Sequence, residues 1–167
     1  MLNACARENS HYGYLDLAPI MQENSSKVKA DLSELWHRIL FSGLIFNTDD
    51  HLHNHGFLRF DRRGWELSPL YDVNPCSERT DYLLLKINDQ ENRAEVDLVL
   101  EVSDFLGIAR HRAERDLKRM KKIISSWPSL TQERGIKKAE IGQIQIAFKR
   151  AEAKMAENTG FEPANGF

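Results

Sequence analysis

The sequence has few cysteines and no long apolar run. Its two cysteines, Cys5 and Cys76, lie far apart and match no zinc-ligand or redox spacing. This usage is typical of free thiols in a reducing compartment rather than of a disulfide scaffold. Residues 1–14 are polar, and no stretch approaches the roughly 18 apolar residues that a membrane span requires. We therefore expect a soluble, cytoplasmic protein without a membrane partner.

The sequence also lacks an excess of either charge. It has 23 Lys and Arg against 25 Asp and Glu, so its formal net charge is -2. This balance gives no general reason to expect nucleic acid or an anionic membrane as the main partner. The length of 167 residues, with 41% apolar and 29% charged residues, is typical of one globular domain. We place that domain at residues 1–157 and expect a disordered tail at 158–167.

Helical spacing of apolar residues dominates the chain. Asp31 and Glu34 have the spacing of a capping box and precede the strongest such pattern. Gly107, Pro128 and Gly135 are expected to end or separate the later helices. The spacing predicts helices in five segments, at residues 13–22, 31–44, 96–106, 113–127 and 141–155. Residues 22–29 are expected to form a loop.

One β-hairpin interrupts the helices. Residues 57–60 and 65–67 are aromatic or apolar in part and flank a polar turn at 61–64, in which Gly64 suits a positive φ angle. Residues 82–87 are compatible with a further short strand, although three consecutive leucines do not separate strand from helix. The predicted fold class is therefore α+β: mainly α with a small β-hairpin.

Chemically informative residues concentrate on the two sides of this hairpin. Phosphoryl transfer to a hydroxyl needs a carboxylate that accepts the proton and oxygen ligands that hold magnesium on the nucleotide phosphates. Protein kinases use an Asp, an Asn five residues later, and a second Asp beyond a hairpin. Asp49 and Asn54 have this spacing, and the hairpin would return Asp72 to their neighbourhood. We predict that their oxygens converge on one hard cation.

The same residues carry a resemblance to a known family. The runs LWHRILF at 35–41, NTDDHLHNHGFL at 47–58 and LSPLYDVNP at 67–75 resemble the C-terminal domain of HipA-family toxin kinases, and the likeness extends over roughly residues 12–150. The resemblance implies a fold like the C-terminal lobe of a kinase. It also implies serine/threonine kinase activity with ATP and Mg2+.

Site roles follow from the resemblance residue by residue. Asp49 is implied as the proton acceptor, and Asn54 and Asp72 as the ligands of Mg2+. The implied contacts with the nucleotide or its metal are His51, Leu52, His53, Asn54, Tyr71 and Asp72. The implied partners are a protein substrate in translation, for example an aminoacyl-tRNA synthetase, and a DNA-binding antitoxin.

The family also has an N-terminal lobe with a phosphate-covering loop and an ATP-binding lysine. None of the nine glycines here clusters into such a loop, and we expect the chain to begin after that lobe. On its own it should bind ATP weakly and transfer little phosphate. A separate N-terminal kinase lobe is thus a further expected partner. The alternative function is a non-catalytic binding module that docks an antitoxin or a complementary kinase subunit.

Three features allow other interpretations. His51, His53 and His55 alternate as in some zinc hydrolases, but the order of ligands differs, and Asn54 suits magnesium better than zinc. Asp50 is interpreted as structural because Asp49 holds the family position. Residues 110–122 carry seven Lys or Arg, which form either a solvent-facing surface or a contact with DNA, RNA or an acidic partner.

Overall fold

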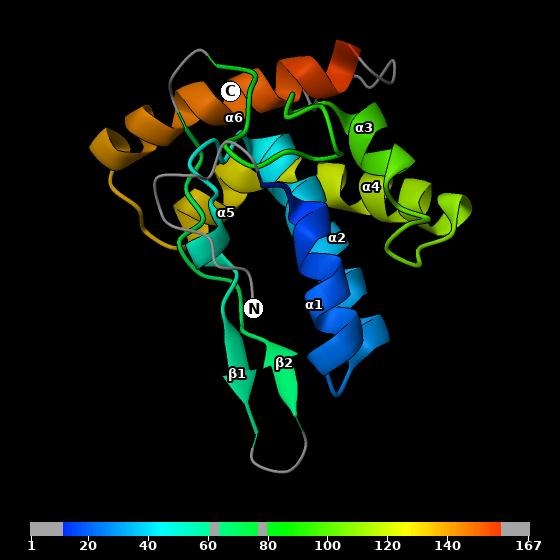
Figure 1. Ribbon diagram of the computed structural model, residues 1–167. Helices are drawn as coiled ribbons and strands as arrows, with labels where there is room; N and C mark the ends of the chain where they lie inside the picture. Colours follow the sequence, from blue (N-terminus) through cyan, green and yellow to red (C-terminus); the bar gives the residue numbers. More distant parts are fainter. Residues whose placement is uncertain (1–11, 61–63, 77–79, 158–167) are drawn as a thin grey trace.

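The computed structural model describes residues 12–60, 64–76 and 80–157. It confirms the predicted α+β class: helices make up most of the described chain, with a two-stranded antiparallel sheet (Figure 1). The elements are η2 (Tyr14–Asp16), α1 (Leu17–Asn24), α2 (Val28–Ile45), η3 (Leu52–Asn54), β1 (Phe57–Arg59), β2 (Trp65–Leu67), α3 (Val96–Glu101), α4 (Arg110–Ser125), α5 (Trp127–Glu133) and α6 (Lys138–Glu157). The predicted tail at 158–167 and Cys5 lie outside the described residues, and Cys76 is partly buried.

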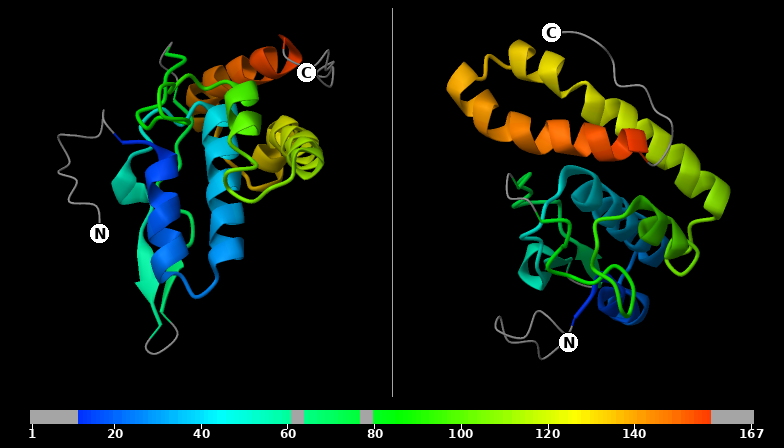
Figure 2. Two further views of the ribbon diagram at one scale, coloured as in Figure 1. Left: turned by 45° about the vertical axis from the view of Figure 1, so that its right-hand side comes forward. Right: turned by 90° about the horizontal axis from the view of Figure 1, so that it is seen from above.

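Helix α2 forms the centre of the fold. It lies between α1 on one side and α4 with α6 on the other, as the view from above shows (Figure 2). Its buried face includes Leu35, Trp36, Ile39 and Leu40, which are all fully buried. The indole Nε1 of Trp36 donates a 2.9 Å hydrogen bond to the carbonyl oxygen of Val99, so α3 is fixed to α2 by a polar contact within the core.

The start of α2 differs from the prediction. The helix begins at Val28, so Asp31 lies in its first turn and does not form a capping box. Its Oδ2 instead accepts hydrogen bonds from Ser25 Oγ at 2.6 Å and from the backbone N–H of Leu67 at 3.1 Å. Helix α1 also continues to Asn24, into the segment predicted as a loop. Asp31 thus ties β2 to the helices, a contact that spacing alone does not predict.

The hairpin is confirmed, with β1 ending one residue earlier than predicted. Phe57 pairs with Leu67 and Arg59 with Trp65, and the N–H of Phe60 bonds to the Gly64 carbonyl at 3.0 Å. Gly64 has φ 95°, a conformation that other residues rarely adopt. In the described chain, residues 82–87 form isolated bridges rather than a named strand.

The later helices divide differently from the prediction. Helix α3 ends at Glu101, earlier than predicted, and turns lead from there to Gly107, which has the left-handed conformation expected of it (φ 75°) but does not end the helix. Phe105 therefore leaves the helical face and is 57% exposed. Pro128 does not follow the end of a helix but lies in the first turn of the next one, α5, where its missing N–H would have no partner within the helix. Gly135, with φ 64°, separates α5 from α6 as predicted.

Trp127 is buried against α6. Its ring stacks on Phe148 with centroids 5.2 Å apart, and its Nε1 donates to Glu152 Oε1 at 3.0 Å. These contacts join α5 to α6. Among the described helices, none is both long enough and apolar enough to cross a membrane.

Candidate functional site

The site begins where α2 ends. Phe46 follows the helix with φ 54°, a left-handed conformation that is uncommon for a bulky residue and is held by its surroundings. Its ring is buried beneath the guanidinium of Arg150 from α6, 4.1 Å from the ring centroid. Its carbonyl accepts hydrogen bonds from the N–H groups of Thr48 and Cys76. The chain is thereby turned out of α2 into the loop that carries the predicted catalytic residue.

The loop at residues 47–55 presents Asp49 to solvent. Asp49 is exposed, and its carboxylate has no hydrogen bond or ion pair with any other residue that the structure describes. The turn η3 then forms through the Asn54 N–H bond to the His51 carbonyl at 2.9 Å. Asn54 is only 4% exposed. Asp49 therefore remains accessible to an incoming group, whereas Asn54 is held close to the protein body.

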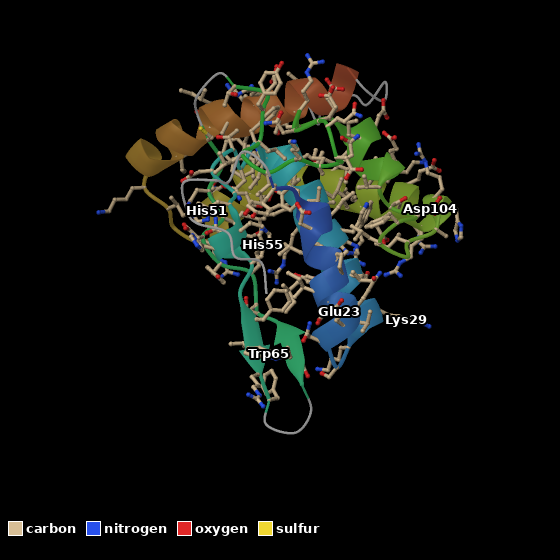
Figure 3. All side chains as sticks on the ribbon, in the orientation of Figure 1. Glu23, Lys29, His51, His55, Trp65 and Asp104 are labelled. Atoms are coloured by element: carbon tan, nitrogen blue, oxygen red, sulfur yellow. The ribbon has the colours of Figure 1, made fainter. Side chains whose placement is uncertain are left out.

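Three further residues predicted to contact the nucleotide, His51, Leu52 and His53, lie in or beside η3. The His51 ring packs edge-on against His53, with centroids 5.6 Å apart, and Leu52 packs against the hydrophobic core. His51 Nδ1 is buried and has no hydrogen-bond partner among the described residues. A buried polar atom of this kind is costly unless another group satisfies it. His51 and His55 lie where the hairpin joins the helices, with Trp65 on the hairpin itself (Figure 3).

The segment after the hairpin docks on this loop. The hydroxyl of Tyr71 donates to the backbone carbonyl of His53 at 2.5 Å, and the N–H of Asn74 donates to Oδ1 of Asn47 at 3.3 Å. The Tyr71 hydroxyl also lies so close to Gly56 that a Cβ there would be only 3.0 Å away. Glycine thus permits the hydroxyl to reach the loop backbone. Residues 71–74 are held against residues 47–53 at both ends.

Asp72 lies between these two contacts. It is exposed and has φ 54°, which Asp tolerates better than most residues because its short side chain forms local hydrogen bonds. Its Oδ1 accepts a 3.1 Å hydrogen bond from Asn74 Nδ2. The structure therefore brings the segment that contains Asp72 to the loop that contains Asp49 and Asn54. The convergence of their side-chain oxygens on one cation stays a prediction.

A buried carboxylate lies directly beside Asp49. Asp50 is 3% exposed and accepts hydrogen bonds from Tyr14 at 2.7 Å, Ser42 at 3.0 Å and His55 Nε2 at 3.1 Å. The sequence marked Asp50 as structural but gave no sign of its partners. Tyr14 and Ser42 come from η2 and α2, and only the fold brings them to the loop.

The electrostatics of this cluster follow from burial and hydrogen bonding. Burial acts to raise the pKa of Asp50, but the hydrogen bond and charge of His55 and the hydroxyls of Tyr14 and Ser42 lower it overall. Burial, followed by the neighbouring Asp50 charge, raises the pKa of Tyr14 well above its ordinary value. Asp50 is therefore ionised and Tyr14 protonated at neutral pH, as a donor–acceptor pair requires.

The zinc alternative gains no support from the geometry. The Nε2 atom of His55 is hydrogen-bonded to Asp50, and the ring of His51 packs on that of His53. Within the described ranges, no group of three or more His, Cys, Asp or Glu residues could hold a metal ion. A site built on Asn54 and Asp72 uses an amide oxygen and one carboxylate, so this observation does not bear on it.

Comparison with known proteins identifies the family. A model of the HipA-like C-terminal domain matches residues 1–132. The chain belongs to the HipA-like C-terminal domain family. A search of curated proteins finds no match. The fold is similar to a chain from the Shewanella oneidensis MR-1 toxin–antitoxin complex of HipA, HipB and operator DNA, with a TM-score of 0.73 and 19% identity.

That structural match covers 89% of the present chain but only 36% of the Shewanella chain. At this identity the likeness establishes the fold of the HipA-like domain and not its activity. The present chain thus spans about a third of the length of the protein that it resembles in structure.

Proposed function

We propose that the chain is the C-terminal catalytic lobe of a HipA-type serine/threonine kinase, the toxin of a toxin–antitoxin pair. In this proposal it transfers the γ-phosphate of ATP to a hydroxyl of a protein substrate when an N-terminal lobe completes the nucleotide site. Membership of the HipA-like C-terminal domain family supports the proposal. The observation that carries it is the docking of residues 71–74 on the loop at 47–53. Tyr71 bonds to the carbonyl of His53, and the N–H of Asn74 bonds to the side chain of Asn47.

This docking matters because the proposed reaction needs groups from both segments. A kinase requires a hydroxyl acceptor and magnesium ligands in one place, and most of its rate comes from positioning and electrostatic stabilisation. Asp49, exposed and unengaged within the described chain, would orient the substrate hydroxyl and accept its proton. The 2.5 Å Tyr71–His53 contact keeps the neighbouring Asp72 at the edge of the same loop.

The available oxygen donors fit magnesium. Mg2+ is commonly bound through one or two protein carboxylates together with substrate phosphates and waters, rather than by a closed protein cage. Asn54 and Asp72 supply an amide and a carboxylate oxygen, and the side chain of Asn54 forms no hydrogen bond with another described residue. When bound, ATP would supply the phosphoryl group, and magnesium would offset the negative charge of the phosphates.

Exposed apolar side chains support an N-terminal lobe as partner. Leu58, Leu70 and Tyr71, on and after the hairpin, are 45%, 41% and 44% exposed. Large apolar side chains that cluster at a surface often mark an interaction site. If a second lobe covers this edge of the site, the chain alone should expose apolar surface near His51, Phe57 and Tyr71, but His51 and Phe57 are only partly exposed. The complementary lobe would cover these side chains and provide the phosphate-binding loop.

The test of the kinase function is phosphate transfer in a reconstituted enzyme. The chain is mixed with, or fused to, a HipA-type N-terminal lobe, and transfer of labelled γ-phosphate to protein is measured. Asp49→Asn should reduce transfer by at least about 100-fold, because the amide keeps the shape but cannot accept the proton. Asp104→Asn is the matched control, since Asp104 is exposed and lies far from His51 (Figure 3). Equal transfer by both variants would exclude Asp49 as the catalytic residue.

A binding module remains the second candidate function. The structural match belongs to an assembly of HipA, HipB and operator DNA, and the basic helix α4 provides a surface for such partners. In this case the chain docks an antitoxin, with or without its DNA, and transfers no phosphate. A reconstituted wild-type enzyme that binds nucleotide and substrate but transfers no phosphate would favour this function over the kinase.

A further inference from the structure

The most heavily bonded carboxylate beside the proposed site has no part in the proposed chemistry. Asp50 is 3% exposed, and its two oxygens accept three hydrogen bonds, from Tyr14, Ser42 and His55. Burying a carboxylate is costly, and the cost is offset only by such a set of donors. A carboxylate needed only to end a helix or cap a turn could remain in water. Its burial calls for a specific role.

The hydrogen bond between Asp50 and His55 closes the loop. Oδ1 of Asp50 lies 3.1 Å from Nε2 of His55, five residues later. Asp49 and Asn54 also lie five residues apart, and each directly precedes one member of the bonded pair. Consecutive Cα atoms are about 3.8 Å apart, so the bond between residues 50 and 55 restricts the separation of residues 49 and 54.

The other two donors fix the closed loop to the protein body. Tyr14, fully buried in η2, donates to Oδ2 of Asp50 at 2.7 Å and packs edge-on against the His55 ring at 5.5 Å. Ser42 in the last turns of α2 donates to the same oxygen. The loop is therefore closed on itself and oriented relative to two separate elements.

We propose that Asp50 is a positioning residue that sets the separation and orientation of Asp49 and Asn54 through its hydrogen bond to His55. The part of this inference that concerns catalysis rests on the proposed kinase function. The part that concerns loop order depends only on the contacts of Asp50. Asp50 touches neither substrate nor metal in this role, and acts through the residues on either side of the bonded pair.

Replacing Asp50 by Asn is expected to weaken the closure without unfolding the chain. The Asn oxygen can still accept from Tyr14 and Ser42, whereas its NH2 group would face the Nε2–H of His55. That clash is relieved only if Nε2 gives up its proton and Nδ1 carries one, but Nδ1 is buried without a partner in the described structure. A buried donor without an acceptor is costly. The bond between residues 50 and 55 should therefore open more often.

The first experiment measures loop order in the chain alone. Residue-resolved amide hydrogen exchange is compared for wild type, Asp50→Asn and Asp31→Asn. Asp31 is a matched control because it is also buried, and it accepts from Ser25 and Leu67 at the opposite end of α2. We expect Asp50→Asn to accelerate exchange at residues 51–55 by about tenfold beyond its global loss of stability, and Asp31→Asn to leave that loop unchanged.

The second experiment measures turnover of the reconstituted enzyme. Asp50→Asn should lower kcat by about tenfold or more, with a smaller change in the KM for ATP, because misplacement of Asp49 is felt most strongly in the transition state. Asp31→Asn should retain the kcat of the wild type. Equal loop exchange in the two variants, or faster exchange without a fall in kcat, would overturn the inference. An inert wild-type enzyme would reject the kinase function, while the exchange data would still decide whether Asp50 orders the loop.

Discussion

The backbone N–H of Asn74 donates a 3.3 Å hydrogen bond to Oδ1 of Asn47, and so joins two segments that are 27 residues apart. Asn47 is 2% exposed and is held in turn by Ser42, which accepts from its Nδ2 at 3.5 Å. A side chain, rather than a strand ladder, therefore positions the segment that contains Asp72. The contact can be removed without altering either proposed metal ligand.

Asn47→Ala should detach this segment. The variant loses both side-chain hydrogen bonds of Asn47, from the Asn74 N–H and to Ser42, at a cost of about 1 kcal/mol in the free energy of unfolding. Amide exchange at Asn74 should accelerate, as measured by NMR. Asn24→Ala is the matched control, because among the described residues the Asn24 side chain bonds only to Ile20, within α1. Unchanged exchange at Asn74 in the Asn47 variant would show that other contacts hold the segment.

The ionised state of Asp50 predicts an acid-dependent loss of stability. Burial opposes the charge, but the hydrogen bonds and charge of its partners lower the pKa of Asp50 below the ordinary value of 3.8. The folded state therefore binds this proton more weakly than the unfolded state. The stabilisation is complete above the unfolded pKa and is lost as pH falls through the lower folded pKa.

This dependence can be measured by denaturant unfolding between about pH 2 and pH 6. The free energy of unfolding of the wild type should fall more steeply with acid than that of Asp50→Asn, which has no carboxylate to protonate at this position. Asp104→Asn, at an exposed position, should retain the wild-type slope. Parallel curves for wild type and Asp50→Asn would contradict the lowered pKa.

Local patterns in the sequence predicted much of the fold. The spacing of Leu35, Trp36 and Ile39 identified α2 because its buried face is long and regular. The positive φ angles at Gly64 and Gly107 were also predictable, because glycine meets little steric resistance there. The helix boundaries that were predicted wrongly lie where a local sequence signal competes with tertiary contacts. Asp31, for example, was read as a cap but is bonded to Ser25 and Leu67.

The candidate site was only partly predictable. The spacing of Asp49, Asn54 and Asp72 pointed to a loop and to a segment beyond the hairpin, and the structure brings these two segments together. It gave no information on the Tyr14–Asp50 bond, whose residues are 36 positions apart. Such contacts depend on the path of the whole chain, and a single Tyr or Asp in the sequence gives no indication of its partner.

Helix α4 allows a test of the proposed contact with DNA. Its cations at Lys118, Arg119 and Lys122 are exposed and have no ion-pair partner among the described residues. If they contact phosphates, replacing all three with Gln should weaken binding of the reconstituted complex to duplex DNA and lower the salt slope by roughly 1–3. Fluorescence anisotropy at several salt concentrations measures both effects.

The other half of α4 provides the matched control. Arg110 is paired with Glu114, and Arg112 and Arg115 lie within ion-pair distance of Asp116. Replacing these three arginines with Gln removes the same formal charge from cations that are already partly neutralised. This triple variant should lose less affinity and less salt slope. Equal losses would mean that total charge, and not a contact at the end of α4, governs binding.

The last prediction separates magnesium binding from proton transfer. Asp72→Asn should preserve the backbone, because Asn also tolerates a φ of 54° and can keep the local bond with Asn74. It removes the only negative charge from the proposed magnesium ligands, so the Mg2+ concentration needed for ATP binding to the reconstituted enzyme should rise by about tenfold or more. Asp49→Asn should leave that concentration unchanged while abolishing transfer, since it removes the proton acceptor only. A fluorescent ATP analogue titrated with Mg2+ measures the first effect, and labelled phosphate transfer the second. If Asp72→Asn binds ATP at the Mg2+ concentration of the wild type, Asp72 is not a metal ligand.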